Sequence, residues 1–279
     1  MIAPRNAEPI RLTDPRACDP ELAGGKASTL ARLAAAGFPV PDGAIVPVDR
    51  GDDADPELIA WLGGGPLVVR SSAIAEDASG ASWAGQYESI LAVSGTAALA
   101  DAIARVRASG PSERAHTYLG RDDTEERIPV LVQRQLTPSG AGVAFTADPI
   151  SGDRDVIVVT ASAGLGTGVV EGAQDTESWT VRSGVASRSG GGVSVLDAPA
   201  ALAVAGLAAR VATALGGGPV DIEWAISGTT LWLLQARPMT ALPDLVAWPA
   251  PRKGPFVRNF RLGAARSRPI RTPRRATTG

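Results

Sequence analysis

Residues 220–240 have the sequence VDIEWAISGTTLWLLQARPMT, and this stretch decides how the second half of the chain folds. Two apolar runs flank the small polar group SGTT, which predicts a β-hairpin. Asp221 and Glu223 are two residues apart, and Gln235 and Arg237 repeat that step twelve residues later. Successive side chains of a strand point to opposite faces, so each polar pair shares one face.

The pairing of the two strands depends on the loop between them. A loop with an odd number of residues, such as 228–230, places Glu223 opposite Gln235 and Asp221 opposite Arg237. The other face then presents apolar side chains to a core: Ile222, Trp224, Ile226, Leu234 and Ala236. Carboxylate and amide oxygens suit Mg²⁺, which usually also binds substrate phosphates. A plain salt-bridged sheet face, with Asp221 bound to Arg237, explains the hairpin equally well.

Outward from the hairpin, the chain alternates between helical and strand patterns. Residues 22–37 are predicted to form a glycine turn followed by a helix, which Gly37 ends. Apolar spacing also predicts helices at residues 96–119, with a break at residues 110–111, and 200–215. Short apolar runs predict strands at residues 67–70, 90–93, 128–136, 141–149 and 155–162. Strands and helices mixed in this way, with hairpins late in the chain, indicate an α+β (mixed α/β) fold rather than a purely parallel sheet.

Charge is distributed unevenly along the 279 residues. Residues 252–279 hold nine basic and no acidic residues, which leaves 18 basic against 29 acidic residues in the rest. The excess of acidic residues in residues 1–251 argues against a nucleic-acid partner. The tail at residues 252–279 is rich in Arg, Pro and Thr, and we expect it to be disordered. Cys18 is the only cysteine, so no intrachain disulfide is possible. The sequence begins without an apolar leader and has no membrane-length apolar run, so we expect a cytoplasmic protein without membrane contact.

Two cations and one loop suggest a phosphate site. Lys26, one of only two lysines, follows Gly24 and Gly25 at a helix start, where backbone N–H groups and charge can hold a phosphate. The spacing is not that of a P-loop, and an exposed capping lysine is an equally good interpretation. Arg70 ends an apolar strand, where a charge usually serves a ligand. Gly85 lies in a loop of small residues that could close over phosphates.

Two other motifs carry less weight. The run GLGTG at residues 164–168 departs from the dinucleotide pattern at Val169, and no strand–helix–strand unit surrounds it. His116, the only histidine, has no nucleophile motif with it. We therefore expect His116 to be a surface or interface residue on a helix.

Six blocks of sequence, taken in order, resemble the nucleotide-binding domain of the phosphoenolpyruvate synthase, pyruvate phosphate dikinase and rifampicin phosphotransferase family. The blocks are GGKASTLARLAAAGFPVPDG, VVRSSAIAEDASGASWAGQYESIL, SERAHTY, VLVQRQLTPSGAGVAFTADPISG, AGLGTGVVEG and DIEWAISGTTLWLLQARPMT. The resemblance implies an ATP-grasp fold, in which ATP lies between two lobes. It divides the chain into a shortened first lobe (1–128), a second lobe (129–243), and a linker with a basic tail (244–279).

The resemblance also implies a role for individual residues. Lys26 and Arg70 match positions that hold the ATP phosphates, and Gly85 and Ser89 match the loop that covers the nucleotide. Gln133 matches a hinge strand near the adenine. Glu223 and Gln235 match metal- and phosphate-binding positions, with Asp221 and Arg237 beside them. The implied ligands are ATP and Mg²⁺, and Lys26, Arg70 and Arg237 are the implied catalytic cations.

In the family, phosphate passes from ATP to a histidine on a separate swivelling domain. This chain departs from the family in three ways: it carries no matching histidine domain, the stretch before Arg70 is short, and the resemblance stops at Gly263, as in a stand-alone or truncated chain. We therefore expect an ATP-binding phosphotransferase domain that acts with a histidine-bearing partner. The alternative is a non-catalytic nucleotide-binding remnant or interaction module.

Overall fold

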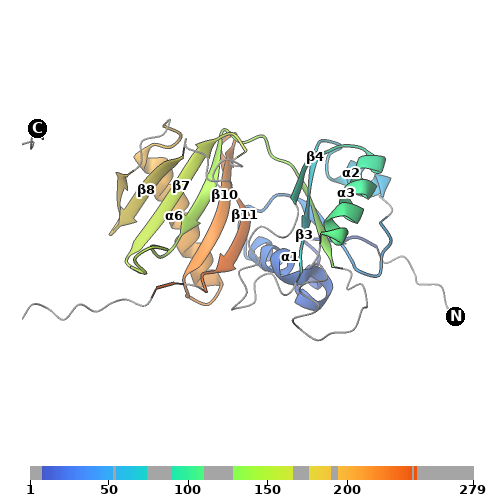
Figure 1. The fold of residues 1–279 in the computed structure, drawn as a ribbon, viewed down its shortest axis with the longest axis horizontal. Coiled ribbons are helices and arrows are strands. Elements are labelled where there is room, and N and C mark those ends of the chain that lie inside the picture. Colours follow the sequence, from blue (N-terminus) through green and yellow to red (C-terminus); the bar gives the residue numbers. More distant parts are fainter. Residues whose placement is uncertain are drawn as a thin grey trace, which may run out of the picture. The chain divides into compact units, whose positions relative to one another are not determined.

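Two antiparallel β-sheets and the helices that pack on them form the protein (Figure 1). The computed structural model describes residues 8–52, 55–73, 89–109, 128–165, 176–189, 194–240 and 242–243. Gly85, His116, most of the GLGTG run and the basic tail lie outside these residues. The predictions made for them are therefore not examined by the structure.

The first sheet has five strands in the order β1-β2-β5-β3-β4. Their bounds are β1 (Ile10–Arg11), β2 (Gly43–Val46), β3 (Leu67–Ser71), β4 (Ser89–Val93) and β5 (Val130–Arg134). One face packs on α2 (Pro56–Trp61) and α3 (Thr96–Ala108), which present Leu58, Leu99 and Ile103 to Val130 and Val132. Because strands alternate, Leu131 and Gln133 face the other way. This second face of the sheet also carries Arg70, which pairs with Leu131.

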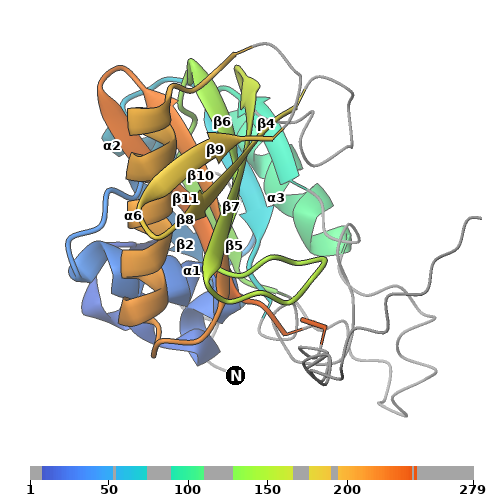
Figure 2. The same cartoon turned by 90° about the vertical axis from the view of Figure 1, so that its left-hand side faces the viewer.

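The second sheet has six strands in the order β11-β10-β6-β7-β8-β9. Their bounds are β6 (Gly140–Phe145), β7 (Val156–Ala163), β8 (Glu177–Arg182), β9 (Val185–Arg188), β10 (Val220–Ser227) and β11 (Thr230–Pro238). One face is covered by α6 (Ala198–Ala214), as Figure 2 shows. Asp197 caps the N-terminus of α6, because its carboxylate accepts from the Ala200 N–H at 2.8 Å. The helix buries Val204, Leu207 and Val211 against the sheet.

Helix α1 (Pro20–Ala35) follows a short 3₁₀ helix, η1 (Pro15–Cys18). Its apolar face, with Leu30 and Leu33, belongs to a hydrophobic cluster that includes Leu131 of the first sheet and Trp224 of the second. The Leu233 N–H of β11 donates to the Pro39 carbonyl at 2.8 Å, just after the helix. Helix α1 thus packs with residues of both sheets.

The structure confirms the α+β class, and several local expectations need correction. The hairpin β8–β9 was not predicted, although its two-residue turn, Ser183-Gly184, contains the glycine that such turns favour. Helix α2 was not predicted either: Pro56 is its first residue, and the Asp55 carboxylate accepts from the Glu57 N–H at 2.8 Å. The division at residues 128/129 stays a prediction, and β5, which follows it, pairs in the first sheet.

Among the described residues, no helix combines the length and apolarity of a membrane span, and the cytoplasmic location stays a prediction.

Candidate functional site

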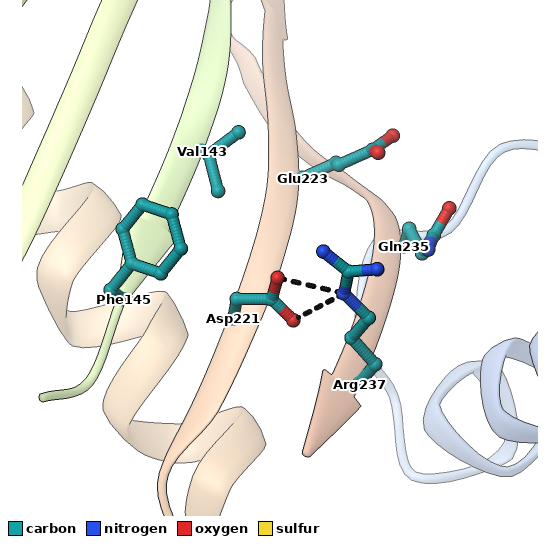
Figure 3. A pocket seen from close by; sticks show the side chains of 6 residues that line it. All are labelled: Val143, Phe145, Asp221, Glu223, Gln235 and Arg237. Atoms are coloured by element: carbon teal, nitrogen blue, oxygen red, sulfur yellow. Dashed lines mark hydrogen bonds and ion pairs between the residues drawn. The ribbon is translucent and has the colours of Figure 1, made fainter. Parts of the chain in front are cut away.

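A small cavity opens on the face of the second sheet that α6 does not cover. Strand β10 lies between β6 and β11, and its register places Asp221 opposite both Phe145 and Arg237. Glu223 lies opposite both Val143 and Gln235. These six side chains line a cavity of about 180 Å³ (Figure 3). The four polar residues singled out in the hairpin are therefore brought together.

The hairpin reaches this pairing by a route that the sequence analysis did not predict. The turn has two residues, Gly228 and Thr229, because Ser227 pairs with Thr230, so the expected odd loop is wrong. A β-bulge restores the predicted register: Glu223 pairs with Gln235, but Trp224 pairs with Leu233, which leaves Leu234 without a partner on β10. Consequently Leu233, fully buried, faces the core in place of the predicted Leu234. Bulges often occur beside functional sites, where they redirect side chains.

Asp221 and Arg237 form an ion pair within the cavity. The Arg237 Nε donates to both carboxylate oxygens of Asp221, at 3.0 and 2.8 Å. Asp221 is only 8% exposed, whereas nearly half of the Arg237 side chain is exposed. Burial raises the pKa of Asp221, and this outweighs the opposing effect of the Arg237 guanidinium. The salt-bridged interpretation thus holds for this pair, while Glu223 and Gln235 lie outside it.

Glu223 is bound from the other sheet. The Arg70 guanidinium of β3 donates to Glu223 Oε2 at 3.4 Å. The Glu223 side chain is 35% exposed and that of Arg70 is 17% exposed. The Arg70 Nε is buried and has no hydrogen-bond partner among the described residues. A largely buried guanidinium with an unused donor is suited to an anionic ligand.

Lys26 lies near the strand end that carries Arg70. Gly24 interrupts α1 with φ 75° and ψ 175°, so the helix resumes at Gly25 and Lys26 lies in the first turn of that second segment. The Ala27 N–H of this turn donates to the Ser72 Oγ at 2.9 Å. Ser72 is two residues beyond Arg70. The predicted helix start at the two glycines is therefore correct for this segment, although α1 as a whole begins at Pro20.

Ser89 and Gln133 lie on the same face of the first sheet as Arg70. Ser89 pairs with Arg70, and residues directly opposite in an antiparallel pair share a face. Gln133 is 5% exposed, and its Nε2 donates to the Pro41 carbonyl at 3.2 Å. Among the described residues, Lys26, Ser89 and Gln133 are not part of the lining of the cavity.

No group of three or more His, Cys, Asp or Glu side chains within the described ranges could hold a metal by itself. The cavity offers two carboxylates and one amide, from Asp221, Glu223 and Gln235. Mg²⁺ typically takes one or two protein carboxylates and completes its shell with water and phosphate oxygens. The donor set thus fits Mg²⁺ that arrives with a phosphate ligand.

Sequence reasoning missed three residues of this region. Val143 and Phe145 form the apolar wall of the cavity. The alternation of side chains along residues 141–149 places these two residues on one face of the strand, and it was the signal that could have identified them. Ser72 is fully buried and holds the turn that carries Lys26. Its role depends on a contact between residues 45 apart, which local sequence does not reveal.

The fold is an α+β domain of two antiparallel sheets, with a polar cavity on the second sheet. Residues 57–189 match the family described as Pyruvate phosphate dikinase, AMP/ATP-binding domain. The chain is 37% identical over 202 residues to a rifampicin phosphotransferase from a Streptomyces species, a match that covers 62% of this chain and 23% of the relative. It is 39% identical over 121 residues to phosphoenolpyruvate synthase of Pyrococcus furiosus, covering 42% and 15% respectively.

A third relative is prodigiosin synthesizing transferase PigC of Serratia marcescens, 31% identical over 292 residues, covering 83% of this chain and 33% of that protein. These matches confirm the predicted resemblance to the ATP-binding domain of the pyruvate phosphate dikinase and phosphoenolpyruvate synthase family. It spans one third or less of each of these relatives. D-alanine–D-alanine ligase of Bacillus anthracis complexed with ATP is similar in fold, with a TM-score of 0.38 and 12% identity, covering 75% of this chain and 53% of the ligase.

Proposed function

We propose that this domain binds Mg·ATP and donates the terminal phosphate to a histidine on a separate swivelling domain. The observation that supports the proposal most is the cavity of β10 and β11. Two acids, an amide and a guanidinium surround it, and Arg70 reaches Glu223 from the first sheet. A site with both hard oxygen ligands and cations suits a metal bound to an anionic substrate.

The charges of the cavity support a divalent cation. Burial raises the pKa of Asp221, so its ionised form is costly without a further positive charge. Glu223 adds a second carboxylate two residues away on the same face. In this proposal Asp221, Glu223 and Gln235 hold Mg²⁺, which neutralises charge on the phosphate groups. The ion thus adds the positive charge that a buried carboxylate needs.

Three cations are proposed to hold the phosphates. Arg70 would turn from Glu223 to a phosphate oxygen, and its buried Nε, which has no hydrogen-bond partner within the described part of the chain, would supply a further donor. Lys26 adds a charge at the start of a helical segment, and Arg237, bound to Asp221, adds another from the lining of the cavity. The role of these groups is to orient and stabilise the transferring phosphoryl group.

The adenine and the covering loop complete the proposal. Gln133 is proposed to lie near the adenine; its Nε2 donates to the Pro41 carbonyl, and its second N–H and its own carbonyl oxygen are the groups proposed to meet the base. Ser89, exposed at the first position of β4, is proposed to follow the covering loop that contains Gly85. The phosphate acceptor is proposed to be a histidine of a partner domain, because the single His116 matches a helix of the nucleotide-binding domain.

Two measurements test the proposal. Calorimetric titration of ATP with and without Mg²⁺ should show binding that depends on Mg²⁺. Radiolabelled ATP, incubated with the protein and a separately produced histidine domain from a curated relative, should then label that domain. Binding without label transfer would favour the alternative, a non-catalytic nucleotide-binding module. Absence of ATP binding would contradict both.

A further inference from the structure

Gly24 allows α1 to approach the end of β3 closely. Its φ of 75° lies in the left-handed region that favours glycine. A Cβ at this position would lie 1.3 Å from the Ser72 carbonyl oxygen and 2.8 Å from its Oγ. A side chain at residue 24 is therefore incompatible with this contact, and the backbone of α1 packs directly on residue 72.

Ser72 takes the place of the N-cap side chain that Gly24 lacks. A helix start leaves backbone N–H groups without partners, and an N-cap hydroxyl usually accepts from the second or third of them. Here the hydroxyl comes from another segment, because the Ser72 Oγ accepts from the Ala27 N–H at 2.9 Å. Ser72 is fully buried, and its own N–H donates to the Pro129 carbonyl at 3.0 Å. The cap is thus fixed to the first sheet.

The position of Ser72 joins two residues of the proposed phosphate site. Lys26 immediately precedes the capped residue Ala27, and Arg70 lies two residues before Ser72 on β3. We propose that Ser72 is a positioning residue, which fixes the Lys26-bearing helix turn to the strand end that carries Arg70 so that both cations act on one phosphate group. This inference rests on the proposed function, because it requires that Lys26 and Arg70 bind ATP phosphates.

The physical effect is preorganisation. Helix ends fray easily, and a turn that has lost its cap must be ordered again when a ligand binds. The cost of that ordering is subtracted from the affinity for the ligand. Ser72 should therefore contribute to ATP affinity through Lys26, without a contact of its own to the nucleotide.

A double-mutant cycle separates this role from a purely structural one. Mg·ATP affinity is measured by calorimetry for wild type, Ser72→Ala, Lys26→Ala and the double variant, at a temperature where thermal melts show each to be folded. Ser72→Ala should weaken binding about fivefold, the scale of one hydrogen bond. In the Lys26→Ala background, the same change should alter affinity by less than about twofold, because residues that act through one another are not additive.

Two further variants keep the test decisive. Ser72→Cys keeps a side chain of similar size but replaces the hydroxyl with a thiol, which is a weak hydrogen-bond acceptor. This variant replaces Ser72→Ala in the affinity measurements if Ser72→Ala does not fold. Ser109→Ala removes another helix-end hydroxyl, which donates to the Val106 carbonyl at 2.8 Å in α3, and should leave ATP affinity unchanged. The inference is overturned, with the proposed function left standing, if wild type and the folded Ser72 variants bind Mg·ATP with equal affinity. It is also overturned if Ser72→Ala weakens binding by the same factor with and without Lys26→Ala. A wild-type protein that does not bind ATP overturns the proposed function, and the inference with it.

Discussion

Glu223 connects the cavity of the second sheet to Arg70 of the first. Its side chain is about one-third exposed, whereas Asp221 is nearly buried and bound by Arg237. Of the two acids, Glu223 is therefore the more open to an incoming cation. Its contact with Arg70, at 3.4 Å, is also longer than a strong charge-assisted hydrogen bond. A ligand that carries both a metal and a phosphate can rearrange this contact at small cost.

The first prediction concerns this acid. Glu223→Gln keeps the shape of the side chain but removes a hard anionic ligand. Mg-dependent ATP affinity should fall at least about tenfold, or about 1.4 kcal/mol. The melting temperature without ligand should change little, because a partly exposed ion pair contributes under about 1 kcal/mol. The measurement is a nucleotide titration with and without Mg²⁺, beside a thermal melt.

A matched control is an ion pair between the β6–β7 loop and strand β8. Asp153 pairs with Arg182 at the surface, outside the cavity. Asp153→Asn likewise removes a carboxylate charge from an ion pair, and it should leave the Mg²⁺ dependence intact. A folded Glu223→Gln protein that responds to Mg²⁺ like wild type would exclude Glu223 as a metal ligand.

At the residue scale, the sequence predicted which polar residues of β10 and β11 lie opposite each other, but it did not predict the turn and the bulge that produce this pairing. The two-residue steps of Asp221–Glu223 and Gln235–Arg237 placed each pair on one face of its strand, but the odd loop expected to bring the four together is wrong, and a bulge sets the register instead. The bulge at Leu234 was not predictable, because alternation alone does not show where a strand inserts an extra residue. The Arg70–Glu223 contact joins residues 153 apart in sequence, so only the tertiary fold reveals it.

Among the elements, the β8–β9 hairpin has a turn that its sequence fits imperfectly. Ser183 and Gly184 have φ of 50° and 77°, and Arg182 pairs with Val185, which makes a two-residue turn with positive φ at both positions. Asn adopts this conformation more readily than Ser, and Asn-Gly is the preferred pair. Ser183→Asn should therefore stabilise the protein by about 0.5 kcal/mol, which is a fraction of the free-energy cost of holding a residue in the left-handed conformation.

Chemical denaturation measures the change in the free energy of unfolding. Ser187→Asn is the control, because Ser187 is exposed within β9, where Asn is disfavoured. That control should be neutral or destabilising. If both substitutions changed stability equally, the turn conformation of Ser183 would not be the cause.

The loop between β6 and β7 is held by Asp148. Its carboxylate accepts from the Ile150 N–H at 2.9 Å and the Ser151 hydroxyl at 2.7 Å. These hydrogen bonds, the Ile150 bond first, lower the pKa of Asp148 below its ordinary value. A lowered pKa means that the stabilisation is complete above the ordinary carboxyl pKa and is lost as the pH falls through the folded-state value.

Asp148→Ala tests this pH dependence. At pH 7 the substitution should lower stability by about 1 kcal/mol, as for a lost capping side chain. As the pH falls through the lowered folded-state pKa of Asp148, the wild-type carboxyl protonates, so the difference in melting temperature between the two proteins should narrow. A difference that widens toward acid would contradict the assignment.

Element prediction succeeded where periodicity was long. The alanine-rich pattern predicted α6 within two residues at its start, and the apolar run 155–162 predicted β7. The short elements failed for a physical reason: α2 and β9 have six and four residues, too few to establish a period. Their signals were local, namely the Asp55-Pro56 helix start and the Ser183-Gly184 turn.

At the scale of the whole molecule, the resemblance of six ordered blocks predicted the class of fold better than any single motif. Glycine at position 24, the strand end at Arg70 and the polar pairs of β10 and β11 each had a plausible structural explanation alone. The structure relates them through Ser72 and through the Arg70–Glu223 ion pair. A site assembled from two sheets should couple ligand binding to the stability of the whole fold.

The last prediction measures that coupling. A ligand that binds only the folded state stabilises it by RT ln(1 + [L]/Kd), which is about 2.7 kcal/mol when its concentration is 100 times Kd. Mg·ATP at that level should therefore raise the melting temperature of the wild type. Arg70→Ala, with affinity about tenfold weaker, should retain only about 1.4 kcal/mol of this stabilisation at the same concentration.

The control is Arg182→Ala, which removes a guanidinium from the second sheet outside the cavity and should retain all of this stabilisation. Equal shifts in all three proteins would show that Arg70 does not bind the nucleotide, and a shift produced by Mg²⁺ alone would show that the stabilisation comes from the metal.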